Sequence, residues 1–524
     1  MGFISSDRSQ MDLFGYSIND FAKTDKKCRF VVDIVSQLDL SELFARYSDQ
    51  GADSYAPDIM LATWFYSYSH TVTSSRKIED LCKFDTRYMY ISCNQHPDHT
   101  TLSRFRKKNI DLICKYFIQI VLIAQQQGLS DFKHIAIDGT KVNAATNSKH
   151  SYTEDELTEK IEAIRKDIVH YMQRCDFVEQ GTTDELDLEI LRAEKQRLEE
   201  LEEKLLQRKE QLQQRKKTLK PEHQSKHRIN IIEPDARLMP KALDLNYNGQ
   251  AAVDVASHLI VAVDAVDKPN DQGQFIPIYN KIETTIGSDP DRSYIADAGY
   301  HNLDDLEYIG KNKINAIIAD TAIQNRSTRS KPTSREKLLK EKRKIERSDF
   351  TYHQEEDYYE CPSGNRLTPV ENKGDKTVYR ASGCNECPLS IYCLSSKKKV
   401  KQIHRSHREA YAEQMANKLQ NPSAREFMLM RKISVEPVFG NLKHNLGFNR
   451  FSLRGLANVK GEFTLMAIAH NLNIMYKWMH KKRFATLIDA SLCTIKQHIA
   501  MSKNFMTTLI SNVVSNFKFK IQYV

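Results

Sequence analysis

Apolar residues recur at helical spacing in the first 130 residues of the chain and predict three helices there, at 56–70, 74–85 and 96–109. Asp98 or Thr100 can cap the third helix. This third helix carries the basic side chains Arg104, Arg106 and Lys107. A helix, a turn and a basic helix have the outline of a helix-turn-helix DNA reader. A solvated basic helix on a helical bundle is the alternative interpretation.

Beyond residue 130 the pattern changes to short alternating runs. The segment 132–145 predicts a strand that carries Asp138 and is broken by a tight turn at Gly139–Thr140. The later segments predict a strand hairpin at 249–267, a helix at 271–287, a strand ending at Asp297, a helix at 303–312, a strand at 314–320, and helices at 424–445 and 456–482. Strands followed by alternating helices and strands predict a mixed α/β sheet.

Two stretches interrupt this core. Apolar residues at helical spacing fill 153–175, and leucines recur every seven residues through 188–219. Two amphipathic helices joined by a short turn predict an antiparallel coiled-coil hairpin, which would act as a spacer or a dimer contact.

The second interruption, from 321 to 424, shows no clear period and contains two basic runs, 326–347 and 397–408, the second including His404 and His407. Between these runs lie the cysteines Cys361, Cys384, Cys387 and Cys393. Four thiolates could form a tetrahedral zinc site that staples a small unit, and buried reduced thiols are the alternative.

Composition narrows the class of protein. The chain has 524 residues, 77 Lys and Arg against 68 Asp and Glu, and a formal net charge of +9, which favours a polyanionic partner. No window is long and apolar enough to predict a membrane helix. Ten cysteines without a secretion signal are typical of a reducing cytoplasm, so we expect a cytoplasmic, nucleoid-associated protein.

Three carboxylates fall where a mixed sheet could bring them together, namely Asp138, Asp297 and Glu436. Convergent carboxylates suit Mg²⁺, and a pair of such ions can drive phosphodiester chemistry. Glu462 is a rival for the third position. Asp254 and Asp271 lie near strand ends, where we expect structural or supporting roles.

The motifs "YAPDIMLATWFYSY", "SSRKIEDLC", "HPDHTTLSRFRKKN", "HIAIDGTKVNA", "YNGQAAVD", "YIADAGYHN", "VEPVFGNLKHN" and "FSLRGLANVKGEF" together resemble those of a family. They resemble the cut-and-paste DDE transposases of bacterial insertion sequences, in the branch with an N-terminal helical domain. The resemblance implies a ribonuclease-H-like core, a metal-binding triad of Asp138, Asp297 and Glu436, and two Mg²⁺ or Mn²⁺ ions. It also implies double-stranded DNA as partner, both element ends and target, and a dimer in the DNA complex.

The resemblance places Lys443 seven positions after Glu436, where it could hold a DNA phosphate, and offers Arg431 or Lys432 as the upstream basic residue. Leu429 stands where many relatives have tyrosine. Pro437 predicts a kink or a fresh helix start. The residues expected to contact DNA are Arg104, Arg106, Lys107, Arg431, Lys443, Arg450 and Arg454.

The chain is therefore expected to divide into an N-terminal helical, DNA-binding domain and a catalytic core with two insertions. The expected ranges are 1–130 for the first domain, 131–320 and 425–482 for the core, 151–228 for the hairpin, 321–424 for the basic and cysteine-rich insertion, and 483–524 for a tail without an assigned role. A metal-dependent nuclease without strand transfer and an inactive, transposase-derived DNA-binding repressor are the alternative functions.

Overall fold

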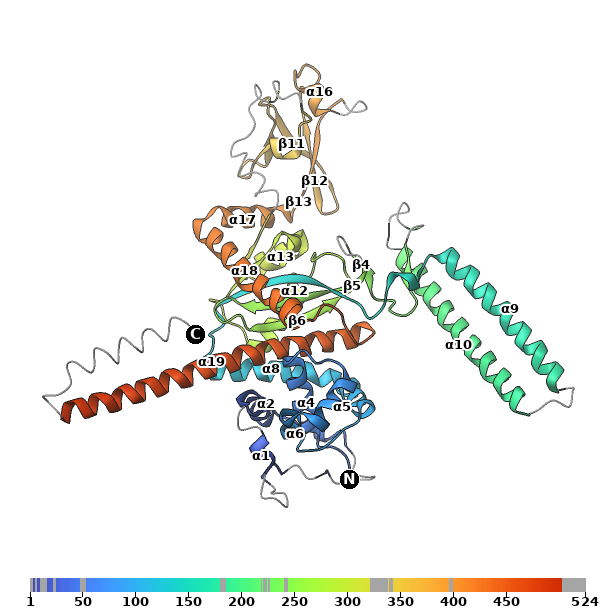
Figure 1. The fold of residues 1–524 in the computed structure, drawn as a ribbon. Helices are drawn as coiled ribbons and strands as arrows, with labels where there is room; N and C mark the ends of the chain where they lie inside the picture. The colour runs from blue at the N-terminus through green and yellow to red at the C-terminus, as the bar shows by residue number, and fades with distance from the viewer. Residues whose placement is uncertain are drawn as a thin grey trace.

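The structure of the chain is a computed structural model, shown as a ribbon in Figure 1. It describes residues 3–4, 7–9, 17–21, 25–47, 53–179, 185–217, 219, 224, 227–239, 244–320, 338, 343–394 and 399–501. Side chains are described for these residues except 178–179, 185–187 and 483–501. In this part of the chain the fold is mixed α/β, with many helices and several sheets.

The central sheet contains the strands β1 (His134–Asn143), β4 (Arg237–Leu238), β5 (Leu245–Asp254), β6 (Ile260–Val266), β7 (Ser293–Ala296) and β8 (Ala316–Ile318). Its order is β4-β5-β1-β7-β8, and β6 also pairs with β5. β5 pairs antiparallel with both β1 and β6, whereas β7 pairs parallel with β1 and β8 pairs parallel with β7. The predicted hairpin at 249–267 and the strand before Asp297 are confirmed.

The turn predicted at Gly139–Thr140 is wrong, because β1 continues through both residues. β5 pairs with β1 along its whole length, with Gly139 opposite Gln250 and Thr140 opposite Gly249. A partner strand of equal length supplies the hydrogen bonds that overrule the local turn preference of a glycine.

Helices surround this sheet. α8 (Ile110–Gln126), α12 (Phe275–Ile286) and α19 (Leu456–Met501) pack against β6, and α8 also packs against the other two helices. α18 (Pro422–Gly440) packs on β1 and β7. α13 (Leu303–Lys311) and α17 (Glu409–Gln420) pack together near β8. α18 continues through Pro437, so no new helix starts there, and a π-helical turn, Asn441–Asn445, follows it.

The N-terminal helices lie against α8 and α19 (Figure 1). They are α1 (Ile18–Phe21), α2 (Lys26–Ser36), α3 (Ser41–Phe44), α4 (Pro57–Ser69), α5 (Ser75–Phe84), α6 (Thr86–Ile91) and α7 (His99–Lys108). Pro57 opens α4, which is buried on almost every side, and the Asp98 carboxylate caps α7. The three predicted helices are confirmed. These helices and the central sheet share one continuous hydrophobic cluster.

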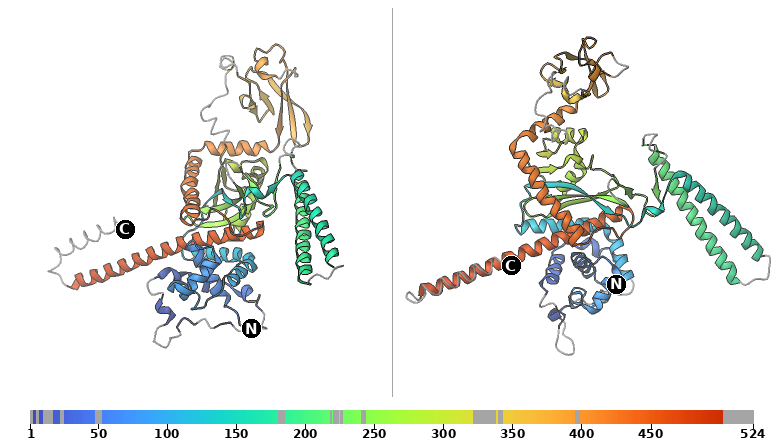
Figure 2. Two further views of the ribbon diagram at one scale, coloured as in Figure 1. Left: turned by 45° about the vertical axis from the view of Figure 1, so that its right-hand side comes forward. Right: turned by 45° about the horizontal axis from the view of Figure 1, so that its top comes forward.

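α9 (Glu154–Glu179) and α10 (Glu185–Lys216) lie side by side and project from the rest of the molecule (Figures 1 and 2). Leu157 and Ile161 of α9 are buried against Leu205 and Leu212 of α10, as the repeat of apolar residues predicted. The short strands β2 (Ser151–Tyr152) and β3 (Ile229–Asn230) pair where the two chain ends of this hairpin meet.

A second sheet lies within 321–424, where the sequence predicted no regular structure. Its strands are β9 (Thr351–His353), β10 (Tyr358–Glu360), β11 (Arg366–Lys373), β12 (Lys376–Ala381) and β13 (Gln402–Ser406), in the order β13-β12-β11-β10-β9. The sheet and the short helix α16 (Ser390–Cys393) have a hydrophobic core of their own. Most of the basic run 326–347 lies outside the described residues.

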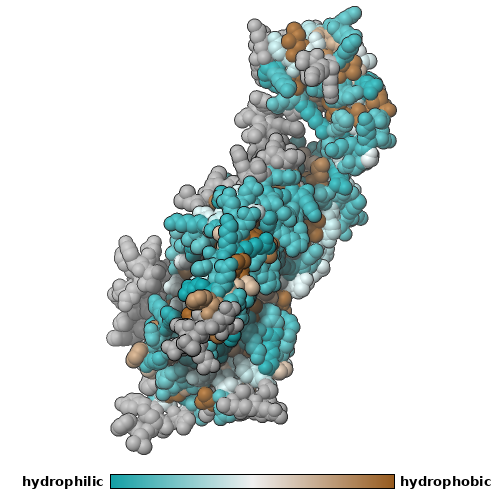
Figure 3. All heavy atoms as spheres, turned by 90° about the vertical axis from the view of Figure 1, so that its right-hand side faces the viewer, coloured by the Kyte–Doolittle hydropathy of each residue, from teal (hydrophilic) through white to brown (hydrophobic). Residues whose placement is uncertain are grey.

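Hydrophilic residues predominate on the face shown in Figure 3, and the hydrophobic ones there form small separate patches. Among the described residues, no helix is both long enough and apolar enough to cross a membrane. Of the tail, residues 502–524 lie outside the described residues.

Candidate active site

The parallel pairing of β1 with β7 brings two of the predicted site residues together. The register runs from His134 opposite Ser293 to Ile137 opposite Ala296, so Asp138 and Asp297 follow side by side. β7 ends at Ala296, and the Asp297 carboxylate accepts a hydrogen bond of 2.8 Å from the Gly299 N–H in the 3₁₀ turn that follows. Asp297 therefore caps a turn and also faces Asp138.

Burial makes both carboxyl groups weaker acids than usual. It raises the pKa of Asp138 to about 6; Arg431 opposes this increase and the negative charge of Asp297 adds to it. Burial likewise raises the pKa of Asp297, and the nearby Asp271 contributes to that increase. Carboxyl groups whose pKa is raised by burial and by a like charge are typical of functional sites.

Arg431 reaches this pair from α18. Its guanidinium forms an ion pair of 2.6 Å with Oδ2 of Asp138, although the resemblance suggested a phosphate contact for this residue. The side chain is buried, and its Nε has no hydrogen-bond partner in the described part of the chain. Arg431 thus partly neutralises the two aspartates.

Glu436 lies on the same helix but on a different side of it. Five residues separate it from Arg431, which corresponds to about 140° around an α-helix. Glu436 is exposed, as is Lys432 one turn earlier. Over the described ranges, no three His, Cys, Asp or Glu side chains stand as a ready-made metal site. The structure thus brings Asp138 and Asp297 together and leaves Glu436 on the adjacent helix.

Two family models match the chain. Residues 17–108 match the model described as "Transposase domain (DUF772)", and residues 360–476 match the one described as "Transposase DDE domain". Over these two ranges the chain is similar to transposases, and over the second range to their DDE domain. The second match includes Glu436, whereas Asp138 and Asp297 lie between the two matched ranges.

Searches for relatives gave one further similarity. No curated protein matches the transposase. A solved structure described as a piggyBac transposase synaptic complex with hairpin DNA, determined by cryo-EM, has 11% sequence identity and a TM-score of 0.30. That match covers 95% of this chain and 84% of the other.

A transposase DDE domain cuts DNA and joins its strands, and enzymes with this domain use divalent metal ions. The part of the transposase that sequence reasoning missed is a group of polar residues beside the two aspartates. These residues are Lys141, Asn248, Gln250 and Tyr300, which surround Asp271, for which the sequence predicted a structural or supporting role. The one available sequence signal was the alternation of Asn248 and Gln250 along strand β5, because Tyr300 and Asp271 lie outside the strands.

Arg106 has a structural role that differs from the predicted DNA contact. It is buried, its guanidinium stacks on the Trp64 ring, and it donates a hydrogen bond of 2.9 Å to the Tyr68 hydroxyl. Arg104 and Lys107 on the same helix are exposed. The basic face of α7 is therefore narrower than its sequence suggested.

Glu462, the other candidate for the third carboxylate, forms hydrogen bonds within the protein core. It is fully buried and accepts hydrogen bonds from the Ser452 and Leu453 backbone N–H groups and from the Tyr68 hydroxyl. These contacts tie α19 to α4 and to the segment that follows the π-helical turn. Asp254 also has a local role, because it accepts hydrogen bonds from Ser130 and Ser257.

The remaining basic candidates lie after α18. Burial lowers the pKa of the Lys443 ammonium, and the nearby charge of Lys141 lowers it further. Arg450 donates to the carbonyl oxygens of Ala144 and Thr146 and pairs with Asp244, so its guanidinium is largely used within the protein. Arg454 is exposed.

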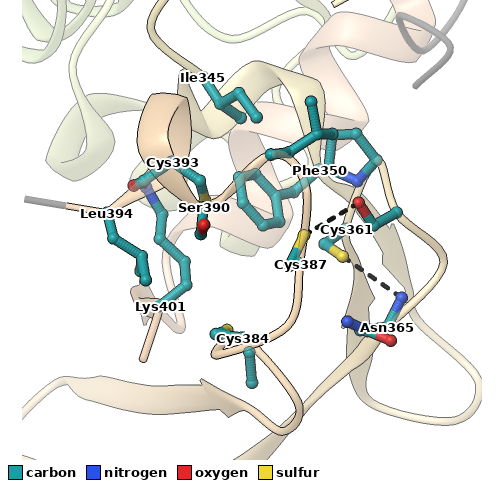
Figure 4. A pocket seen from close by; sticks show the side chains of 14 residues that line it. Ile345, Phe350, Cys361, Asn365, Cys384, Cys387, Ser390, Cys393, Leu394 and Lys401 are labelled. Atoms are coloured by element: carbon teal, nitrogen blue, oxygen red, sulfur yellow. Dashed lines mark hydrogen bonds between the residues drawn. The ribbon is translucent and has the colours of Figure 1, made fainter. Parts of the chain in front are cut away.

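The four cysteines of the second sheet line one small cavity of about 20 Å³ (Figure 4). Cys361 follows β10, Cys384 and Cys387 follow β12, and Cys393 ends α16. The Cys361 sulfur accepts a hydrogen bond of 3.3 Å from the Asn365 N–H. Burial raises the pKa of the Cys393 thiol, and the three other cysteines add to the increase. None of these four cysteines forms a disulfide bond.

Proposed function

We propose that Asp138, Asp297 and Glu436 form the catalytic triad with which this transposase cuts and joins DNA strands at the ends of an insertion sequence. The observation that carries the proposal is the pairing of β1 with β7, which sets two half-buried carboxyl groups side by side under α18. A three-stranded antiparallel unit followed by two strands parallel to β1 supports a ribonuclease-H-like core.

The donor chemistry fits two hard divalent cations, Mg²⁺ or Mn²⁺, because carboxylate oxygens are the ligands that both prefer. Bound there, the ions would activate water or a 3′-hydroxyl and stabilise the leaving oxygen of a phosphodiester. Arg431 now holds one Asp138 oxygen, and Glu436 stands apart. Completing the site therefore requires the Arg431 side chain to leave Asp138 or the Glu436 side chain to approach.

Basic side chains around the aspartates would hold the DNA backbone. Lys141 and Lys443 lie close enough to repel each other, and a phosphate between them would relieve this repulsion. Arg104 and Lys107 on α7 would read the end sequence, and Lys443, Arg454 and a released Arg431 would grip phosphates beside the cut. A dimer would supply one active site for each element end.

The cysteine unit would bind one zinc ion. Four soft thiolate donors suit tetrahedral zinc, and they enclose a small cavity in a sheet with a limited core. The backbone hydrogen bond to the Cys361 sulfur would stabilise a thiolate there. The thiols would have to converge on the ion, since no ready-made site exists among the described residues.

The triad is tested with labelled DNA that carries the element's own ends. Asp138→Asn, Asp297→Asn and Glu436→Gln should each reduce cleavage by about a thousandfold or more, the loss expected when several kcal/mol of metal-ion stabilisation is removed. DNA binding should persist, because phosphate contacts come mainly from Lys and Arg. Near-normal cleavage by Asp297→Asn would refute the assignment.

A further inference from the structure

Asp271 lies in the loop between β6 and α12, beside both aspartates of the proposed triad. Its charge helps to raise the pKa of Asp297. Burial raises the pKa of the Tyr300 hydroxyl, and the charges of Asp271, Asp138 and Asp297 add to that increase. The sequence alone suggested only a supporting role for Asp271. The surrounding atoms indicate a more direct one.

Two glycines make the approach of Asp271 possible. A side chain at Gly139, directly after Asp138, would collide with Oδ1 of Asp271. A Cβ atom at Gly299 would lie 3.1 Å from Oδ2 of Asp271 and 3.0 Å from Oδ1 of Asp297. The Asp271 carboxylate thus fills the space that glycine leaves beside each aspartate.

The two oxygens of Asp271 have different environments. Oδ1 accepts hydrogen bonds from Asn248 Nδ2 at 2.8 Å and Gln250 Nε2 at 2.7 Å. Gln250 is held in turn by the Tyr300 hydroxyl. Oδ2 lies towards Asp297 and has no hydrogen bond from any of the described residues. The carboxylate is therefore anchored through one oxygen and presents the other to Asp297.

The same contacts leave a buried oxygen without a donor. Asn248 is fully buried, and donation from its Nδ2 to Asp271 fixes which way the amide points. Its Oδ1 then lies 3.1 Å from the position of a Cβ at Gly139 and has no partner in the described part of the chain. Buried amide oxygens normally find a partner, and a cation is one.

We propose that Asp271 is an additional carboxylate ligand of the divalent-cation site, binding through Oδ2 beside Asp297, with the Asn248 amide oxygen as a neighbouring donor. This inference rests on the proposed metal site. The alternative use of Asp271, as a cap of α12, does not apply, because Gln274 occupies the cap position and the side chain of Asp271 bonds to β5 instead.

The test is Mn²⁺ binding to the full chain without DNA, measured by the electron paramagnetic resonance signal of free Mn²⁺. Asp271→Asn should weaken binding by about 10- to 100-fold, as expected for loss of a ligand or of its direct support. The matched control is Asp289→Asn, since Asp289 precedes β7 at its other end and pairs with Lys133. This control should bind Mn²⁺ as the wild type does.

A second variant separates ligand geometry from overall charge. Gly139→Ala changes no charge and meets no strained backbone, because Gly139 has no positive φ, yet its methyl group must displace Asp271. It should weaken Mn²⁺ binding in the same way, and thermal unfolding of the metal-free protein would show that both variants fold. Wild-type Mn²⁺ affinity in folded Asp271→Asn would overturn the inference. If Asp138→Asn and Asp297→Asn also bind normally, the proposed metal site itself fails.

Discussion

At the scale of single residues, two oxygen atoms beside the aspartate pair have no hydrogen-bond donor among the described residues. Asp271 Oδ2 and Asn248 Oδ1 both lack donors in the described part of the chain, although the groups around them are hydrogen-bonded. The guanidinium of Arg431 supplies the positive charge that pairs with Asp138. A site with free oxygens and an internal cation is consistent with one that exchanges that cation for a metal ion on binding DNA.

The sequence could indicate Asp138 and Asp297, because each ends or interrupts an apolar run that reads as a strand. It could not indicate that Asp271 approaches this pair so closely, or that Arg106 is buried. Both depend on close approach in three dimensions, the first on the missing side chains of Gly139 and Gly299 and the second on the Trp64 ring.

His470 on α19 supplies a prediction about acid. Burial lowers its pKa to about 4, and the neutral ring donates from Nε2 to the His258 carbonyl and accepts at Nδ1 from the Asn441 amide. The unfolded chain takes up the proton near pH 6.5, before the folded protein does. Stability from this group is therefore complete above pH 6.5 and falls as the pH drops towards 4, by up to about 3 kcal/mol.

Urea unfolding at several pH values between 4 and 7 would measure this effect. His470→Gln should unfold more easily at pH 7 and show a shallower loss of stability on acidification than the wild type. The control His404→Gln changes an exposed histidine on β13 and should follow the wild-type profile. An unchanged pH dependence in folded His470→Gln would show that other groups control acid unfolding.

At the scale of elements, prediction succeeded where one apolar period ran for many residues. α9 and α10 follow their repeat, α4 begins at Pro57, and α7 begins directly after its cap Asp98. The β9–β13 sheet was missed because β9 and β10 have only three residues each and β11 is exposed at almost every position, so no alternation marks it.

The α9–α10 hairpin should behave as a cooperative unit of its own. Leu205 is buried between the helices, whereas its neighbour Leu206 is exposed. Leu205→Ala should therefore destabilise the hairpin by about 2–5 kcal/mol and speed amide hydrogen exchange in both helices. Exchange in β1 and β5 should not change, and Leu206→Ala should leave all four elements as they are. Faster exchange in β1 would show that the hairpin and the core unfold together.

The cysteine unit gives a second prediction at this scale. Freshly reduced protein should contain about one zinc per chain, and Cys384→Ser should lose both the metal and the order of the β9–β13 sheet. Cys114→Ser, which changes an exposed cysteine on α8, should keep the zinc. Metal analysis that finds no zinc in the wild-type protein would favour reduced thiols packed in a small core.

At the scale of the whole molecule, one hydrophobic cluster joins the N-terminal helices to the central sheet, while the hairpin and the second sheet project from it (Figure 2). The hydrogen bond from Tyr68 on α4 to Glu462 on α19 crosses this junction, and Arg106 on α7 donates to the same Tyr68 hydroxyl. Because the junction is packed, α7 and the aspartate pair are held at a fixed separation. A single chain therefore presents two separate basic surfaces, one on α7 and one after α18.

These two surfaces should respond differently to mutation. Arg104→Ala should reduce discrimination between element ends and scrambled duplex, by about 1–3 kcal/mol if the side chain reads a base edge. Lys443→Ala should reduce cleavage, weaken binding to both DNAs alike, and lower the slope of binding against salt by about one. Binding of each variant to both duplexes across a salt series, with cleavage measured in parallel, makes the comparison. Lys418→Ala, on α17 outside both surfaces, is the control. Wild-type discrimination by Arg104→Ala would assign α7 to the packing of the helical bundle, and the reading of the element ends would have to lie elsewhere in the chain.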